Sequence, residues 1–369
     1  MAAFRLAKLV DKKLLKITGP DCYPYLQSLF CNDLRLLYEP DRLVARTHAS
    51  VSPSVQSSFM LNAQGRIICD VILYRTPNTQ YRCNFTPPGE ATDQDELLIE
   101  CDSTLASGLA NTLYGYRVRR KVSIEVVDTK SVWCLFPETK QEPGGTSLRG
   151  RSESTLVETS KALAKTREVI DDDLVVVADP RLYMLGLRIL NRSEANGHPE
   201  MEFDELKSKL TSMVGVEIKK GTSNDYLIHR LSLGVGEGPG DHPEGNCLPL
   251  ESNADYLGSV SFEKGCYLGQ ELTARIHFTG VVRKRLMPVY IHKETKKTDV
   301  TPYHPGTDIL DAESGKKLGI LRQVFKSHTL ALLRHDLINE TTELIHQGTE
   351  TKISTWKPYW WENVYPPVE

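Results

Sequence analysis

The sequence lacks the short motifs that identify several common kinds of site. It contains no Cys-x-x-Cys, no His-Glu-x-x-His and no cysteine–histidine pairing at zinc spacing, so a zinc site has no support. It has no Gly-x-Ser-x-Gly turn of the kind that presents a hydrolase serine. No glycine-rich loop is followed by Lys-Ser or Lys-Thr, the pair that completes a phosphate-cradling loop. Because these motifs are absent, none of them identifies a functional site in this chain.

An excess of positive charge is also missing. The 45 lysines and arginines face 48 aspartates and glutamates, a net charge of −3, which argues against a protein whose whole surface binds nucleic acid. No apolar run approaches the roughly 20 residues that a membrane span needs. With 369 residues, 40% hydrophobic and 25% charged, the composition is that of a globular protein of two or three domains. We expect neither nucleic-acid binding nor a membrane span.

Cysteine is present at a moderate level. A chain of this length can build a core without disulfides, so we expect reduced thiols in an intracellular compartment. The eight cysteines are Cys22, Cys31, Cys69, Cys83, Cys101, Cys134, Cys247 and Cys266.

Hydrophobic periodicity predicts an α+β body followed by an all-β domain. Strands are expected at 4–10 and 14–18, and a hairpin at 59–73. Asp21 is expected to cap a helix. Further helices are expected from residue 103, at 202–214 and at 222–233.

The predicted domains are a body at 1–280 and a C-terminal β-barrel at 281–369, because short strands with Pro and Gly punctuation follow residue 283. A polar insertion is expected at about 137–168, where apolar residues are few. The aromatic cluster at the C-terminus is expected to pack the barrel onto the body. Its members are Trp356, Tyr359, Trp360 and Trp361.

A glycine-rich stretch at 234–240 resembles a dinucleotide loop at first sight. The third glycine of that motif is replaced by Pro239 or Asp241, depending on where the count starts, and a helix rather than a strand precedes it. The stretch is therefore interpreted as a flexible connection, with Glu237 as a polar group that could contact a ligand.

The densest polar stretch surrounds Cys266. Leu268, Leu272 and Ile276 form an apolar helical stripe, so Cys266 is expected in the turn just before a helix. A helix N-terminus and the adjacent Lys264 both favour a thiolate, the form that binds a soft metal or attacks an electrophile. The other seven cysteines are interpreted as small buried packing residues.

The motif Lys-Gly-Cys-Tyr-x-Gly-Gln-Glu at 264–271 resembles the signature of the YgfZ-type branch of the folate-binding, aminomethyltransferase-like (GcvT-like) superfamily. Shorter matches follow the same order along the chain. They lie at 14–21, 61–66, 116–122, 179–181, 249–253 and 282–286.

This resemblance implies a GcvT-like body with a ferredoxin-like subdomain, a central folate-type pocket and a terminal β-barrel. It also implies a role in the mitochondrial matrix in maturing 4Fe–4S proteins, such as aconitase-type and radical-SAM lipoate enzymes, together with an A-type iron–sulfur carrier. Tetrahydrofolate is the cofactor that it implies. The implied site residues are Cys266 with Lys264, Gly265, Tyr267, Gly269, Gln270, Glu271 and Arg275, and for folate Asp70, Tyr226, Arg230 and Glu237.

The sequence departs from the family in one place that bears on chemistry. The true aminomethyltransferases have two successive aspartates after the hairpin, the first of which does the chemistry, and here the pair is Cys69-Asp70. This departure argues against folate-dependent aminomethyl transfer, which we keep as the alternative function. A thiol redox protein is a third hypothesis, disfavoured because no resolving cysteine lies close to Cys266 in sequence.

An iron–sulfur cluster held by one chain usually takes four thiolates. This chain offers one cysteine in a ligand-like setting, so we expect Cys266 to share a transient 2Fe–2S cluster with the carrier's cysteines. The basic stretch at 116–121 is interpreted as a solvated strand edge, with contact to a phosphate, a folate tail or an acidic partner as the minority interpretation.

Overall fold

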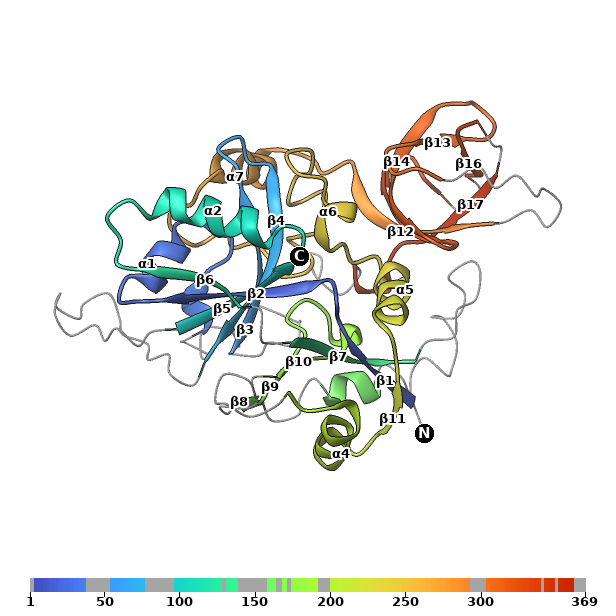
Figure 1. The fold of residues 1–369 in the computed structure, drawn as a ribbon. Coiled ribbons are helices and arrows are strands. Elements are labelled where there is room, and N and C mark those ends of the chain that lie inside the picture. Colours follow the sequence, from blue (N-terminus) through green and yellow to red (C-terminus); the bar gives the residue numbers. More distant parts are fainter. Residues whose placement is uncertain are drawn as a thin grey trace, which may run out of the picture.

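The computed structural model describes a two-part molecule, a layered body and a C-terminal barrel (Figure 1). The described residues are 3–37, 54–76, 96–127, 131–138, 158–163, 168–170, 174–191, 200–292, 303–339, 342–348 and 351–361.

The first sheet of the body is antiparallel, in the order β3-β4-β5-β2-β6. Its strands are β2 Lys12–Thr18, β3 Val55–Leu61, β4 Ile67–Arg75, β5 Glu96–Asp102 and β6 Ser123–Val127. Helices α1 (Cys22–Gln27) and α2 (Ala106–Arg117) cover one face of it, where Tyr25 and Leu113 pack against strand residues such as Ile17.

The second sheet has the order β11-β1-β7-β10-β9-β8. Its strands are β1 Ala3–Lys8, β7 Ser131–Pro137, β8 Val169–Ile170, β9 Leu174–Ala178, β10 Leu187–Asn191 and β11 Glu217–Lys220. Helix α4 (Phe203–Val214) covers its outer face through Leu206 and Leu210. The inner faces of the two sheets share one core, in which Tyr74 of β4 and Cys134 of β7 take part.

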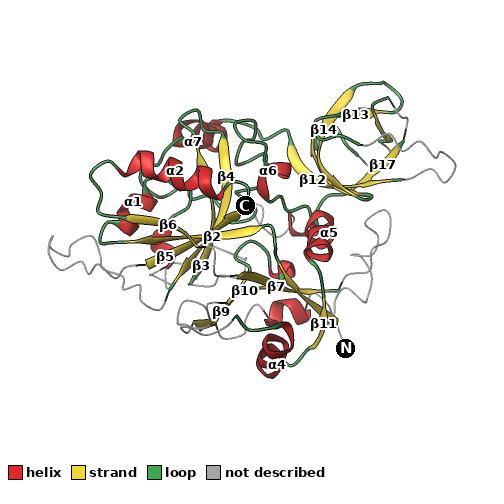
Figure 2. Cartoon of the chain, viewed as in Figure 1, coloured by secondary structure: helices red, strands yellow, loops and turns green. Residues whose placement is uncertain are grey.

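Further helices and short 3-10 turns of the described part belong to the body and its link to the barrel, in addition to a helical segment at 158–163 (Figure 2). The helices are α5 Ser223–Leu233, α6 Gly238–Asp241 and α7 Gln270–Thr279, and the turns are η1 Leu34–Leu37, η4 Tyr183–Leu185 and η6 Tyr359–Trp361.

The barrel is closed, in the order β12-β15-β14-β13-β16-β17. Its strands are β12 Arg285–Ile291, β13 Asp308–Asp311, β14 Lys317–Phe325, β15 His328–Leu333, β16 Leu344–His346 and β17 Lys352–Thr355. The indole nitrogen of Trp360 donates to the carbonyl of Leu233 at 2.8 Å, and Trp360 is buried in the body's core. The expected packing of the C-terminal aromatics is therefore confirmed.

The α+β class, the first two strands, the hairpin and the three later helices are confirmed, although β1 and β2 belong to different sheets. The predicted cap is wrong: the Asp21 side chain caps nothing in α1 and instead accepts the backbone N–H of Lys121 at 2.8 Å. The glycine-rich stretch is not a loose connection, because residues 234–238 are buried and lead into α6. Most of the expected polar insertion lies outside the described residues.

Helices of the described part are too short or too polar to cross a bilayer.

Candidate functional site

Cys266 lies in the irregular segment between Ser261 and the start of α7, and its side chain is exposed. The other six cysteines in the described part are buried, and Cys83 lies outside it. For these six the prediction of packing residues is confirmed; burial raises the pKa of five of them, for example that of Cys101 to about 12. Cys266 is thus the described thiol that another molecule can reach.

Lys264 has a different task from the one expected. Its ammonium donates to three backbone carbonyls near the end of α1, those of Gln27 (2.6 Å), Phe30 (2.6 Å) and Asn32 (2.9 Å). Burial lowers the pKa of Lys264 to about 8. The side chain therefore ties the Cys266 segment to the body, and its charge is directed at carbonyls rather than at the thiol.

Gly269 is the residue that lets α7 approach the β3–β4 hairpin. It has φ of 75°, and a Cβ there would collide with the carbonyl oxygen of Asn62 in the hairpin turn. One residue earlier, Leu268 N–H donates to the carbonyl of Ser28 at 3.0 Å. Tyr267 is buried in a small cluster with Cys31 and Leu61. These contacts fix the end of the segment. Cys266 is therefore held three residues before Gly269, the N-cap of α7.

The outward side of the motif is open. Glu271 and Arg275 are exposed on α7, whereas Gln270 accepts the Tyr267 N–H at 3.3 Å and so has a local structural role. Gly265 is exposed, and a Cβ on it would meet nothing within 4 Å. The space around residue 265 therefore does not require glycine there. Within the described residues no group of three His, Cys, Asp or Glu could hold a metal ion.

A second cluster of polar residues lies between the two sheets, and Glu237 is at its centre. The Glu237 carboxylate accepts from Lys12 (2.9 Å), Arg181 (2.7 Å) and Arg188 (2.9 Å), and from the Tyr226 hydroxyl (2.7 Å). Burial alone would raise the pKa of Glu237, but these three cations together with Arg230, 3.8 Å away, outweigh it and hold the pKa well below its usual range.

The network extends on both sides of Glu237. Arg188, whose side chain is 0% exposed, also pairs with Glu100 and Asp179, each at 3.0 Å. Arg230 pairs with Asp241. The network thus joins four cations to four carboxylates, listed as Lys12, Arg181, Arg188 and Arg230 with Glu100, Asp179, Glu237 and Asp241. Tyr226, Arg230 and Glu237 are therefore buried network members and not groups on a helix surface.

Cys69 and Asp70, the pair in which the sequence differs from the aminomethyltransferases, point to opposite faces of β4. Cys69 lies in the core beneath α1 and α2, where burial raises the pKa of its thiol well above the usual value. Asp70 points the other way, accepts the Gly238 N–H at 2.8 Å and borders a small cavity beside Glu237. Asp70 lies within β4, not at its end, and it is the member of the pair that faces the network.

This cavity does not fit the tetrahydrofolate that the resemblance implies. Its volume is about 20 Å³, room for about one water, whereas ligand pockets measure roughly 300–1,000 Å³. The residues that were expected to hold folate bind one another instead, since Glu237 is taken by Tyr226 and three cations. None of residues 264–271 borders the cavity among the described residues, so the thiol and the network form separate sites. Folate binding stays a prediction of the resemblance.

Sequence reasoning missed six charged members of the network, Lys12, Glu100, Asp179, Arg181, Arg188 and Asp241. One signal could have found Arg188: it interrupts the apolar strand Leu187–Asn191, and a charge in a buried strand needs a partner. The carbonyls that hold Lys264 carry no such signal, because every residue has one.

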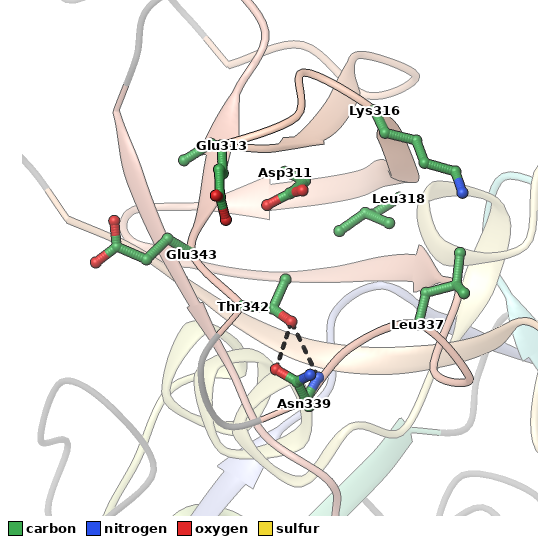
Figure 3. Close-up of a pocket in the computed structure, with 9 residues that line it drawn as sticks. Asp311, Glu313, Lys316, Leu318, Leu337, Asn339, Thr342 and Glu343 are labelled. Atoms are coloured by element: carbon green, nitrogen blue, oxygen red, sulfur yellow. Dashed lines mark hydrogen bonds between the residues drawn. The ribbon is translucent and has the colours of Figure 1, made fainter.

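A larger groove of about 630 Å³ lies on the barrel (Figure 3). Asp311, Glu313 and Glu343 contribute carboxylates, yet Figure 3 shows Glu343 pointing away from Asp311, so they do not converge on one point. Asp311 is already used by the N–H and hydroxyl of Ser314. No residue of the Cys266 motif borders this groove.

Comparison with known proteins places both parts of the chain. Residues 283–363 match the family model of the CAF17 C-terminal beta-barrel domain. The fold is similar to that of the glycine cleavage system aminomethyltransferase T from Bartonella henselae, with a TM-score of 0.60 and 14% identity over 99% of this chain and 88% of that one. The predicted aminomethyltransferase-like body with a terminal β-barrel is confirmed.

Similarity in sequence extends over almost the whole chain. The mitochondrial iron-sulfur cluster assembly factor IBA57 of Homo sapiens is 32% identical over 98% of this chain and 87% of that protein. The Mus musculus protein of the same name is 31% identical over 97% and 86%. A homologue from Dictyostelium discoideum is 30% identical over 76% and 61%. The chain therefore belongs to the family of the iron-sulfur cluster assembly factor IBA57.

Proposed function

We propose that this protein is a mitochondrial iron–sulfur cluster assembly factor that helps to mature 4Fe–4S proteins together with an A-type carrier in the matrix. The relatives that carry the assembly-factor name support the role and the mitochondrial setting. The observation that carries the proposal is the exposure of Cys266, in contrast to the six other cysteines of the described part. Clients of the aconitase and radical-SAM lipoate type follow from the family resemblance.

The proposed step is an exchange of ligands at a 2Fe–2S cluster, which is the cargo. The Cys266 thiol loses a proton as its Sγ binds one iron. Because such a cluster usually has four thiolates, the carrier supplies the other three, and a carrier thiolate that leaves the iron takes up that proton. No electron is transferred in this step, so it needs no oxidant or reductant.

A shared site is supported because the described part of the chain offers one accessible thiol, that of Cys266. Among the described residues no group of three or more Cys, His, Asp or Glu could hold a metal ion. The anchors at Lys264 and Gly269 hold the segment on either side of Cys266, so the thiol is presented at a fixed place. A ligand that is already placed loses less conformational freedom when a partner binds.

The test is anaerobic reconstitution of a cluster in the presence of the carrier, followed by visible absorption and size-exclusion chromatography. We expect wild type to form a complex that elutes with the cluster chromophore, and Cys266→Ser to lose it. Cys247→Ala is the matched control, because it removes a cysteine that is buried. Its complex should keep the chromophore.

Two results would contradict the proposal. One is a Cys266→Ser complex with the same spectrum and stability as wild type. The other is wild-type protein that holds a cluster as a monomer without any carrier, since one accessible thiol does not account for four ligands.

A further inference from the structure

The loop after α2 exposes an unusual set of side chains. Residues 118–121 form an exposed tip, here called the basic tip, made of Val118, Arg119, Arg120 and Lys121. Val118 is 83% exposed, the largest such value among the exposed hydrophobic residues of the described part. The three cations that follow form no ion pair with a described residue. Arg117, which precedes Val118, instead makes a cation–π contact, with its guanidinium 5.0 Å from the centre of the Tyr114 ring.

The backbone of the tip is also strained. Val118 has φ of 47° and ψ of −105°, a region that β-branched residues avoid. Such a conformation costs about 1–3 kcal/mol and persists where the surroundings impose it. Here the imposing contact is the Asp21 carboxylate, which accepts the Lys121 N–H at 2.8 Å, while Lys121 O accepts the Asp21 N–H at 3.4 Å. The fold thus holds an apolar side chain and three cations out into solvent.

Helix α1 joins this tip to the Cys266 segment. Asp21, which holds the tip, is the N-cap of α1, and Ser28, whose carbonyl accepts Leu268 N–H, is its C-cap. At 1.5 Å per residue the two anchors are about 10 Å apart. Figure 1 shows α1, α2 and α7 gathered on one side of the body, away from the barrel and from α4.

We infer that the basic tip is a docking contact for an acidic surface of the protein that shares the Cys266 cluster. This inference rests on the proposed function and names the surface that the partner must carry. A standard interface covers about 800 Å² per partner, a patch roughly 30 Å across, which is wider than the distance of about 10 Å between the two anchors. A partner of ordinary size can therefore contact both Cys266 and the tip. Three unpaired cations attract carboxylates during the encounter, and Val118 offers apolar area at the contact.

An acidic protein surface fits better than the alternatives. The aromatic residues beside the tip, Tyr114 and Tyr116, are 47% and 43% exposed, and side chains of this kind are common at protein interfaces. A net charge of −3 gives the whole molecule no attraction to nucleic acid or to an anionic membrane. The attraction is local, next to the proposed shared thiol.

The test compares association of the cluster-loaded A-type carrier with four variants by stopped-flow or biosensor kinetics. At about 50 mM salt we expect Arg119→Glu/Arg120→Glu to lower the association rate constant about tenfold, and the difference to shrink below about twofold at 500 mM salt. The matched control Lys207→Glu/Lys209→Glu reverses two charges on α4, on the opposite layer of the body, and should change the rate less than about twofold.

Val118→Gly gives a second measurement that does not depend on charge. Glycine relieves the strained φ, so its melting temperature should be equal to or above that of wild type, while its dissociation from the carrier should be about threefold faster. A folded Arg119→Glu/Arg120→Glu variant that associates as fast as wild type would overturn the inference. So would tip-dependent binding to vesicles with about 30% phosphatidylglycerol, if carrier kinetics are unchanged.

Cys266→Ser separates this inference from the proposed function. With an intact tip, this variant should keep the salt-dependent first encounter and fail to hold the cluster. If Cys266→Ser retains the cluster in the complex, the proposed function fails whatever the tip variants do. If Cys266→Ser loses the cluster and the tip variants behave as wild type, the function stands and the docking contact falls.

Discussion

Gly269 of the motif lies directly against Gly65 of the β3–β4 hairpin. A Cβ on Gly269 would come within 3.1 Å of the Gly65 Cα, and a Cβ on Gly65 would come within 2.9 Å of the Gly269 carbonyl oxygen. Both residues have φ of 75°. The two glycines therefore make a contact that no other pair of residues could make, and it fixes α7 on the hairpin.

The first prediction uses this contact. Gly269→Ala should destabilise the protein by about 2–4 kcal/mol, because the side chain meets backbone and the backbone conformation is unfavourable. Gly265→Ala is the matched control: its Cβ meets nothing within 4 Å, so the free energy of unfolding should change by less than about 0.5 kcal/mol. Urea unfolding measures both. Equal losses in the two variants would show that the contact is not what anchors α7.

The second prediction concerns Lys264. Lys264→Met should cost about 2–4 kcal/mol of unfolding free energy, because three backbone carbonyls, two of them in buried contacts, lose a charged donor. Lys209→Met, on the exposed side of α4, is the control and should be neutral. The Lys264 variant should also capture the cluster with the carrier less efficiently even where it is folded, because Cys266 is no longer held. Unchanged stability would contradict the anchoring role.

A third prediction addresses the network between the sheets. Glu237→Gln should destabilise the protein by about 3–5 kcal/mol, because Lys12, Arg181 and Arg188 lose the carboxylate that they share in a buried place. Glu271→Gln, at an exposed position of α7, should have an effect near zero. Thermal and urea unfolding measure the difference in unfolding free energy between each variant and wild type. If the free energy of Glu237→Gln equals that of wild type, the network does not stabilise the body.

A pH dependence follows from His229, which is buried and has its Nε2 2.7 Å from the carbonyl of Met184. Burial lowers the pKa of His229 from 6.5 to about 4. Between these values the unfolded chain takes up a proton that the folded chain does not, so stability present above pH 6.5 is lost as the pH falls. The slope for one such group approaches about 1.4 kcal/mol per pH unit.

The measurement is the difference in unfolding free energy between wild type and His229→Gln at pH 7, 6 and 5. Glutamine does not titrate in this range, so the cost of the substitution should shrink as the pH falls. A difference that is constant over this range would show that His229 is not held neutral in the fold.

The reactivity of Cys266 gives a fifth prediction. In a Cys83→Ser background, an excess of a disulfide reagent such as Ellman's should modify one thiol rapidly in the folded protein and the remainder after unfolding. The fast phase should vanish in Cys83→Ser/Cys266→Ser. Two or more fast thiols in the folded background protein would contradict the burial of the other six cysteines.

The sequence predicted the elements with strong periodicity and the place of the reactive cysteine. The hairpin at 59–73 and the helix with Leu272 and Ile276 depend on spacing within a few residues, which can be read from the sequence. Leu268, the first residue of the predicted stripe, lies before the N-cap of α7. Cys266 was recognised from its flanking glycines and polar neighbours. Its exposure agrees with that interpretation.

The sequence could not predict contacts between distant parts of the chain. Glu237 meets Lys12, which is more than 200 residues away, and the strands that bring them together are set by the packing of two sheets. The glycine-rich stretch is interpreted from the sequence as a flexible connection because glycine and proline are frequent in loops, yet residues 234–238 are buried. The role of Lys264 was missed for another reason, because backbone carbonyls have no identity in a sequence.

The exposure of Cys266 also determines what kind of process can set the pace of the proposed function. A thiol on the outside of the body needs no lid to open and no channel through which cargo must diffuse. The proposed exchange is then limited by how often two protein surfaces meet and how long they remain together. Its rate should rise with carrier concentration and fall with solvent viscosity, and a cluster held there is within reach of dissolved oxygen.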